Sequence, residues 1–253
     1  GAALKKMLND HKIVEYIKLQ SEKIERFIQK KQQFIELLKE QRQAIISNVI
    51  TKGINHSVSY ILSGINYLGD IPEHWKVRRL KFCIVNKLKY GANESGVEFE
   101  PNYYRYIRIT DFNNDGELSD ENKLYLPVDK GSEYKLANND ILFARSGATV
   151  GKSFIFQSKN ENEKYCFAGY LIKATPNKNI ILPYFLYNYS MSLAFENWKN
   201  QALIKATIEN IGANKYSSLF VPVPPLNEQS DILNYISNET NVINDTITKA
   251  EKE

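Results

Sequence analysis

The segment Ile13-Val14-Glu15-Tyr16-Ile17 returns 219 positions later as Ile232-Leu233-Asn234-Tyr235-Ile236. Solenoid repeats have periods of about 20 to 50 residues, so this period belongs to another kind of architecture. It predicts that a long helix and a globular domain alternate along the chain, with one domain between two equivalent helices. Six positions are identical in the two copies, all at helical spacing: Ile13, Tyr16, Ile17, Ile24, Ile28 and Lys30, matched by Ile232, Tyr235, Ile236, Ile243, Ile247 and Lys249.

The first copy begins a long apolar pattern over residues 12–52. Neither glycine nor proline interrupts it, and Gly53 follows as a natural stop. A helix of about 40 residues is about 60 Å long, which is too long for a compact core. We therefore expect residues 1–53 to form one helix of a coiled coil, with two shorter helices packed on the domain as the alternative. Polar residues at seam positions predict a defined partner helix: Gln20, Lys31 and Arg42.

The pattern changes after Gly53. Residues 54–74 lack periodicity and predict a connector, whereas residues 75–225 alternate short β-type runs with turn clusters. Residues 226–253 repeat the start of the long helix. The expected fold class is α+β, a strand-rich domain flanked by a long helix and by the start of a second one. The β-type runs are 81–85, 103–109, 124–126, 141–144, 152–156, 169–174 and 219–223, and an apolar stripe predicts a helix over 181–200.

The composition is that of an ordinary globular protein, with 43% hydrophobic and 25% charged residues. No run of 18 apolar residues occurs, so no membrane-spanning segment is expected. Cys83 and Cys166 lack CxxC spacing, which favours two buried, reduced thiols in a cytoplasmic protein over a disulfide. The histidines are scattered, so no metal site is expected: His11, His56 and His74.

The net charge of +4 is unevenly distributed, and basic residues gather after the connector. Such a cluster suits a polyanion, although a solvated basic face explains it equally well. An Arg/Tyr-rich run follows at 103–108, in which strand alternation places Arg105 and Arg108 on opposite faces. We predict that both arginines contact DNA, with tyrosines packed in a β core as the alternative. The cluster comprises Lys76, Arg78, Arg79, Lys81, Lys87 and Lys89, of which Lys87 and Lys89 are candidate DNA contacts.

Residues 146–153 superficially resemble a phosphate-binding loop of the form G-x-x-x-x-G-K-[ST]. Ser146 occupies the first glycine position, however, and a strand pattern follows instead of a helix. The better interpretation is a tight turn that offers charged and hydroxyl groups to phosphates and base edges. The candidate DNA contacts in this loop are Arg145, Ser146, Thr149 and Lys152, and a polar segment further along adds Lys205, Thr207, Asn214 and Lys215. For each of these residues, a solvated surface role is the alternative.

Catalytic motifs are missing from the sequence. It contains no G-x-S-x-G nucleophile elbow, no H-E-x-x-H pair and no glycine-rich loop for SAM or a dinucleotide after a strand. We therefore expect a chain that is not an enzyme and that holds no cofactor.

Four further segments occur in a recognisable order. They read LLKEQRQAII at 37–46, GDIPEHW at 69–75, ILFARSGATVGKS at 141–153 and VPVPPLNEQ at 221–229. Together they resemble the specificity (S) subunit of type I restriction–modification enzymes. The first is similar to the end of that family's central helix, and the second to the entry of a target recognition domain. The third resembles a loop inside such domains, and the last resembles the PPLxEQ junction with the following helix.

This resemblance implies two recognition domains separated by two long antiparallel helices, each domain reading half of a split double-stranded DNA sequence. It also implies that the helices dock DNA adenine methyltransferase subunits and, indirectly, a restriction subunit. Methylation with SAM and ATP-driven cleavage would then reside on other chains. This chain carries one recognition domain and a short second helix, so we expect a half subunit or a fragment. Two copies paired through their helices would recognise an interrupted palindrome.

Two functions of other classes remain open. One is a coiled-coil assembly adaptor without DNA contact, which the modest charge of the domain favours. The other is a small-molecule enzyme built on the strand-rich domain, which would show activity as the purified chain.

Overall fold

The computed structural model describes residues 2–112, 116–204 and 210–252, with side chains from Lys12 onward. The chain divides into two compact units. The helical unit comprises Gly1–Ala44 and Asn238–Glu253, and the globular unit comprises Ile45–Ser237. Two long helices pass from one unit into the other: α1 (Ala2–Lys52) and α6 (Leu226–Lys252).

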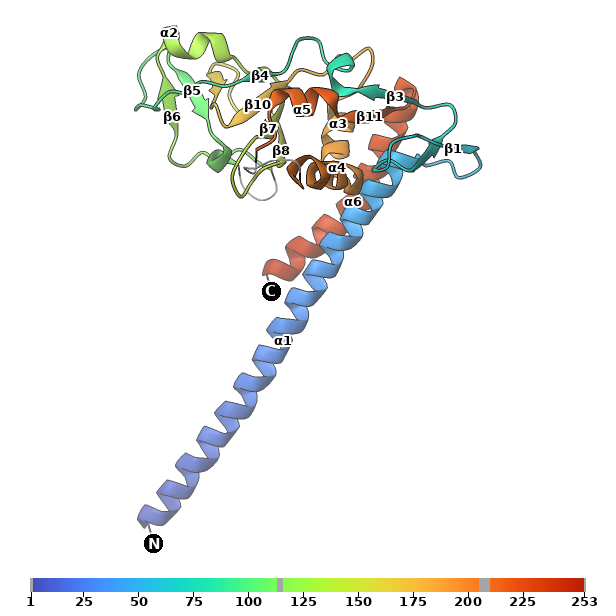
Figure 1. Cartoon of the computed structure of the whole chain (residues 1–253). Helices are drawn as coiled ribbons and strands as arrows, with labels where there is room; N and C mark the ends of the chain where they lie inside the picture. Colours follow the sequence, from blue (N-terminus) through green and yellow to red (C-terminus); the bar gives the residue numbers. More distant parts are fainter. Residues whose placement is uncertain (1, 113–115, 205–209, 253) are drawn as a thin grey trace. The chain divides into compact units, whose positions relative to one another are not determined.

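In the helical unit, α6 lies antiparallel beside the second half of α1 (Figure 1). Arg42 Nη1 donates a hydrogen bond to Asn244 Oδ1 at 2.8 Å, and Ile243 and Ile247 of α6 are buried. The uninterrupted α1 confirms the prediction of one long helix over 12–52. From Ile13 to Ile28, α1 keeps its large apolar side chains exposed: Ile13, Val14, Tyr16, Ile17, Leu19, Ile24, Phe27 and Ile28.

The described part of the globular unit holds four small sheets (Figure 1). The central sheet is antiparallel with the strand order β4-β10-β7-β8. A second sheet has the order β6-β5-β9, with β9 parallel to β5. Two ribbons, β1–β2 and β3–β11, complete the set. The strands are β1 (Tyr60–Leu62), β2 (Asp70–Pro72), β3 (Lys76–Arg79), β4 (Lys89–Tyr90), β5 (Tyr104–Ile107), β6 (Leu124–Leu126), β7 (Ile141–Ala144), β8 (Ser153–Ile155), β9 (Lys164–Phe167), β10 (Leu171–Ala174) and β11 (Phe220–Val223).

Short helices connect and cover these sheets. They are η1 (Leu80–Phe82), η2 (Ile109–Asp111), α2 (Val128–Gly131), η3 (Ser132–Tyr134), α3 (Pro183–Ser190), α4 (Leu193–Ile204) and α5 (Ala213–Ser218). The α+β fold class is thus confirmed. Among the described residues, none of the helices has both the length and the apolar character that a membrane span requires.

Six of the seven predicted β-type runs contain a strand, and two predictions of local structure are wrong. Residues 81–85 lie partly in η1, because Leu80 and Cys83 are both buried at a spacing of three, which suits a 3₁₀ turn. The helix predicted over 181–200 is two helices, α3 and α4. The break occurs at Ser192, whose hydroxyl accepts a hydrogen bond from the Phe195 amide at 3.3 Å. This bond caps the start of the second helix.

The main core joins the inner ends of the long helices to the domain. Ile46 and Ile50 of α1 and Ile232 of α6 belong to the same buried cluster as the central sheet. Within this cluster the ring of Phe143 on β7 stacks on that of Tyr216 on α5 at 4.7 Å. Burial of one large apolar side chain contributes about 1.5 to 3 kcal/mol. The helix ends are therefore part of the fold of the globular unit.

The segments GDIPEHW (69–75) and VPVPPLNEQ (221–229) meet around Gly53. Glu228 accepts hydrogen bonds at Oε1 from Trp75 Nε1 (3.0 Å), and its Oε2 lies 2.8 Å from His74 Nε2. Gly53 has φ +76°, and a Cβ there would lie 3.2 Å from both the Glu228 carboxylate and the Trp75 ring. A side chain at this position would therefore be strained and crowded. The neighbouring Gln229 is fully buried.

Both cysteines are free and buried. Burial raises the pKa of Cys83 to about 11 and that of Cys166 to about 12. Because the thiolate is the nucleophile, we expect iodoacetamide at pH 8 to leave both thiols of the native protein unmodified. In denaturant, where a thiol pKa is about 8.5, both should react. Mass spectrometry of the native protein that shows rapid alkylation at either cysteine would contradict this burial.

Candidate nucleic-acid interface

Residues 145–152 form a turn at one end of the central sheet, between β7 and β8. The Val150 amide donates to the Gly147 carbonyl, and the Lys152 amide donates to the Thr149 carbonyl, both at 2.9 Å. Gly147 and Gly151 have φ values of +76° and +84°, which favour glycine. A Cβ on Gly147 would face open space, whereas one on Gly151 would overlap the Lys199 side chain. Strand β8 follows the turn, so the loop lacks the helix that a phosphate-binding P-loop requires.

Arg145 is held over an aromatic ring. Its guanidinium carbon lies 5.0 Å from the centre of the Tyr90 ring, a cation–π distance. Nη1 makes one long contact, 3.5 Å, to the Gly169 carbonyl, and the buried Nε has no hydrogen-bond partner. Among the described residues, no carboxylate forms an ion pair with Arg145. Within the described part of the chain, the positive charge of Arg145 therefore has no carboxylate partner.

Two tyrosines that the sequence did not single out accompany Arg145. Tyr90 is 41% exposed and Tyr170 is 67% exposed. The Tyr90 hydroxyl accepts a hydrogen bond from the Ala213 amide at 2.8 Å, which fixes the ring against the start of α5. The Tyr170 carbonyl accepts from the Arg145 amide at 3.0 Å. Tyr90 directly follows Lys89, the last residue of the basic cluster. This position is the sequence feature that could have identified Tyr90 as part of the site.

The other predicted residues of the loop have different surroundings. Lys152 is exposed, whereas Ser146 and Thr149 are half-buried. Ser146 forms an isolated antiparallel bridge with Asn210, so the loop is tied to the segment before α5. The structure thus brings Arg145, Ser146, Thr149 and Lys152 together.

The candidate DNA contacts predicted near α5 differ in their surroundings. Asn214 is exposed, but Lys215 Nζ donates to the Ala202 carbonyl at 2.8 Å and thereby ties α5 to α4. Lys205 and Thr207 lie outside the described residues.

Arg105 is in the interior. Its side chain is 2% exposed, and its guanidinium pairs with Asp120 at 2.9 Å and donates to the Ser119 carbonyl. Glu163 lies 3.9 Å from the same nitrogen. A ligand at the surface cannot reach this group, because the 119–120 segment covers the strand face that alternation had assigned to DNA contact. Lys123 and then Arg105 and Lys159 hold the pKa of Asp120 at about 2, so the carboxylate stays charged.

Arg108 has a local role. Its Nη2 lies 2.7 Å from Asp111 Oδ1 and donates to the Asn122 carbonyl at 2.9 Å. The Asp111 carboxylate also accepts from the Arg108 amide at 2.7 Å, so the pair caps η2. With 30% of its side chain exposed, Arg108 is accessible but already neutralised.

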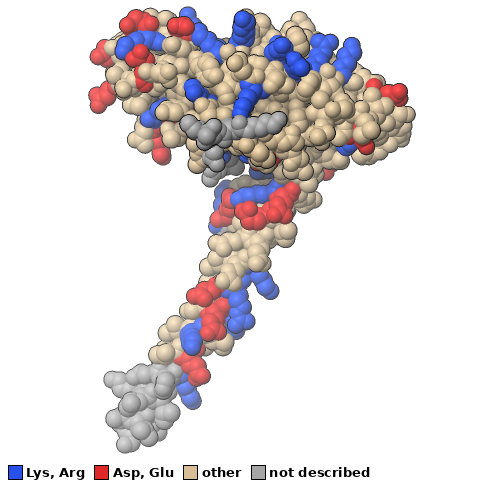
Figure 2. Space-filling view, in the orientation of Figure 1, with Lys and Arg blue, Asp and Glu red and all other residues tan. Residues whose placement is uncertain are grey.

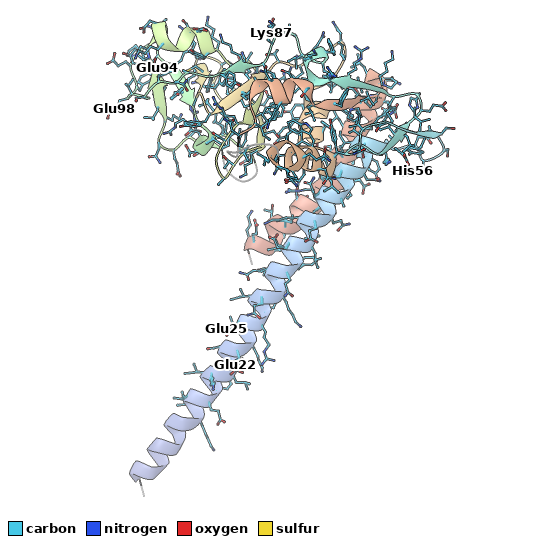
Figure 3. The ribbon with its side chains drawn as sticks, viewed as in Figure 1. Glu22, Glu25, His56, Lys87, Glu94 and Glu98 are labelled. Carbon is cyan, nitrogen blue, oxygen red and sulfur yellow. The ribbon has the colours of Figure 1, made fainter. Side chains whose placement is uncertain are left out.

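A separate basic edge runs from β3 to β4. No Asp or Glu occurs between Glu73 and Glu94. Figure 2 shows Lys and Arg gathered along the upper edge of the domain, where Lys87 projects in Figure 3. Lys89 pairs with Glu133 at 3.2 Å, whereas Lys87 is exposed. The basic edge comprises Lys76, Arg78, Arg79, Lys81 and Lys87.

The predicted contacts therefore fall into two groups. In the register of the central sheet, Lys89 lies opposite Lys173 and Tyr90 lies opposite Ile172. Because Leu171 pairs with Ala144, the side of β4 that carries Tyr90 is the side that carries Arg145. Lys87 belongs to the second group, the basic edge.

Comparison with known proteins connects this arrangement to a family. The family model described as "Type I restriction modification DNA specificity domain" matches residues 72–253. The Type I restriction enzyme EcoBI specificity subunit of Escherichia coli is 26% identical over 80% of this chain. The Putative type I restriction enzyme MjaX specificity subunit of Methanocaldococcus jannaschii is 31% identical over 72% of it. The chain spans 43% of the length of each of these relatives.

Solved structures share the fold. A chain from a structure of the type I R-M system, solved for its complex assembly and conformational transition, has a TM-score of 0.69 at 18% identity. It is matched over 95% of this chain and 54% of its own length. The HsdS subunit from Thermoanaerobacter tengcongensis has a TM-score of 0.58 at 18% identity, over 96% of this chain and 52% of its own. With the family model matching most of its length, this chain belongs to the type I restriction modification DNA specificity domain family.

Proposed function

We propose that this chain is a non-catalytic, sequence-specific reader of double-stranded DNA, with residues 75–225 as its target recognition domain. It reads one half of a bipartite site in a type I restriction–modification complex. The observation that carries the proposal is the group of side chains at the end of the central sheet. There Arg145 and Lys152, without carboxylate partners among the described residues, lie with the exposed rings of Tyr90 and Tyr170.

This chemistry suits a DNA groove. Phosphate oxygens accept hydrogen bonds from Lys, Tyr and hydroxyl side chains and fix the protein on the duplex, whereas base edges provide the sequence information. Arg145, Ser146, Thr149 and Lys152 supply both kinds of donor from one turn. We assign Lys87 and the basic edge to phosphate contact, which strengthens binding without sequence preference.

Selection from a pool of random DNA duplexes tests this function. The full chain should be used alone and with the methyltransferase subunits of its system. We expect enrichment of a short defined sequence and binding that weakens steeply with salt. A pool that stays random in both experiments would contradict DNA reading and favour the coiled-coil adaptor.

The long helices offer a surface for partners. In the sequence repeat, Ile24 and Ile28 of α1 are equivalent to Ile243 and Ile247 of α6. The α6 pair is buried, whereas Ile24 is 58% and Ile28 is 47% exposed. Glu22 and Glu25 project from the same half of α1 (Figure 3). The α1 residues equivalent to the buried isoleucines of α6 are therefore exposed. We assign the exposed stripe formed by Ile24 and Ile28 to contact with a partner helix, which a second copy of the chain can supply.

In the assembled complex, we further assign α1 and α6 to docking of DNA adenine methyltransferase subunits. A restriction subunit would associate through those subunits and not directly. Pull-down of the full chain with purified methyltransferase subunits, with and without the restriction subunit, tests this order of assembly.

The double variant Ile24→Glu, Ile28→Glu should abolish self-association, because two carboxylates cannot be buried in an apolar seam. Analytical ultracentrifugation should show a molar mass near twice 29.2 kDa for the unmodified chain and 29.2 kDa for the variant. Gln29→Glu with Gln33→Glu places the same charges on the opposite face and should leave the dimer intact. A single-copy mass for the unmodified chain at tens of micromolar would contradict a homodimer.

A further inference from the structure

Asn210 lies beside the DNA-facing turn, although it is 65 residues from Arg145 in the sequence. It forms an antiparallel bridge with Ser146, and the amide of the next residue, Ile211, donates to the Arg145 carbonyl at 2.8 Å. These backbone contacts place Asn210 opposite Ser146 and Ile211 opposite Arg145 at the end of the sheet. The 205–209 segment before Asn210 lies outside the described residues.

Both side chains contain a polar atom that lacks a hydrogen bond. Among the described residues, Asn210 Oδ1 and Arg145 Nε are two of the three shielded side-chain atoms without a partner. Native proteins pair the great majority of such atoms, and the exceptions call for an explanation such as a functional role. Here the two atoms are an acceptor and a donor, and they belong to neighbouring residues at the proposed DNA surface.

The chemistry of these two side chains matches base edges in the major groove. Asn can bond adenine at N6 and N7 through its carbonyl and amino groups, and Arg can bond guanine at O6 and N7. Because Oδ1 is shielded, the Asn210 amide must turn to present it to a base, and the two ends of the amide have nearly the same shape. The Tyr90 ring supports the Arg145 guanidinium from one side and leaves its other nitrogens for a base.

We propose that Asn210 and Arg145 determine sequence specificity, with Asn210 reading an adenine and Arg145 reading a guanine at a neighbouring base pair. Asn210 is bridged to Ser146, the residue next to Arg145, so both residues belong to the same end of the sheet. This inference rests on the proposed DNA-reading function and adds a residue, Asn210, and the bases that the pair recognises.

Duplex selection with single variants of the full chain tests the assignment. Asn210→Ala should reduce discrimination for adenine at one position by about tenfold or more and leave the other positions unchanged. Arg145→Ala should do the same for guanine at the neighbouring position. Asn210→Asp should shift the preference at the first position toward cytosine, whose N4 amino group donates to a carboxylate. Asn234→Ala, on an exposed position of α6, and Lys178→Ala, at an exposed loop, should change no position.

The outcomes separate this inference from the function on which it rests. If the unmodified chain enriches no sequence, DNA reading itself fails. If it enriches a sequence and Asn210→Ala or Asn210→Asp leaves that sequence unchanged, Asn210 has no role in specificity and the inference is wrong. A uniform loss of affinity, with the preferred sequence retained, would likewise assign Asn210 to structure alone. Thermal unfolding of each variant should be measured so that misfolded protein is excluded from the comparison.

Discussion

Replacement of Gln229 by leucine should lower the free energy of unfolding by about 3 to 5 kcal/mol, because it leaves three backbone groups in buried or half-buried surroundings without partners. The Gln229 carbonyl accepts from the Leu182 amide at 2.8 Å. Its amino group donates to the carbonyls of Ile180 at 3.0 Å and Pro224 at 2.9 Å. Leucine has a similar volume, so the loss reports the hydrogen bonds and not a cavity.

Urea denaturation followed by circular dichroism measures this change. Ser230→Ala is a matched control at the next position, where the hydroxyl is exposed, and we expect a change below about 0.5 kcal/mol. A Gln229→Leu variant as stable as the unmodified chain would show that the side chain does not join α6 to the domain.

Removal of both Arg145 and Lys152 should reduce affinity for the preferred duplex by at least about a hundredfold. In the proposed interface Arg145 would contact a base and Lys152 a phosphate, so we expect specific binding to fall more than binding to random DNA. The plot of log K against log salt should also become shallower, by about 0.9 for each lost phosphate contact. Fluorescence anisotropy with the preferred and a scrambled duplex, over a series of salt concentrations, measures all three quantities.

The double variant Arg26→Ala, Lys178→Ala is the control, since it removes two positive charges at other exposed positions. If this control weakens binding as much as Arg145→Ala with Lys152→Ala, general charge and not the turn at the sheet end controls affinity.

Local patterns in the sequence predicted much of the fold. The repeat and the uninterrupted pattern over 12–52 predicted α1 and the start of α6, because helical periodicity depends on neighbouring residues alone. The runs at 124–126 and 141–144 coincide with β6 and β7. Strands β3 and β9 were not predicted, since their sequences are largely polar or mixed and their pairing comes from distant partners.

The candidate site was less predictable, because burial depends on segments far apart in the sequence. Alternation placed Arg105 on a strand face but could not show that residues 119–120 cover that face. Likewise, Asn210 is brought to this turn by its bridge to Ser146 and by the hydrogen bond from the Ile211 amide to the Arg145 carbonyl. A sequence pattern identified the turn, but not the residues that tertiary structure adds to it.

The segment VPVPPLNEQ (221–229) has a structural role that the sequence alone did not reveal. In VPVPPLNEQ, Glu228 bonds Trp75 of GDIPEHW, and Gln229 satisfies the backbone before α3 and α6. Glu228 and Gln229 hold the start of α6 within the globular unit, and neither belongs to the turn at 145–152. Variation in DNA specificity should therefore arise from the turn at 145–152 and from Asn210, with the junction unchanged.

Competition between two duplexes tests sequence-specific DNA reading most directly. The full chain, with its methyltransferase subunits, is bound to the duplex enriched by selection and competed with a scrambled duplex of equal length and composition at fixed salt. We predict a preference of at least about a hundredfold for the selected sequence. Equal affinity for the two duplexes would contradict the proposal that this chain reads DNA sequence.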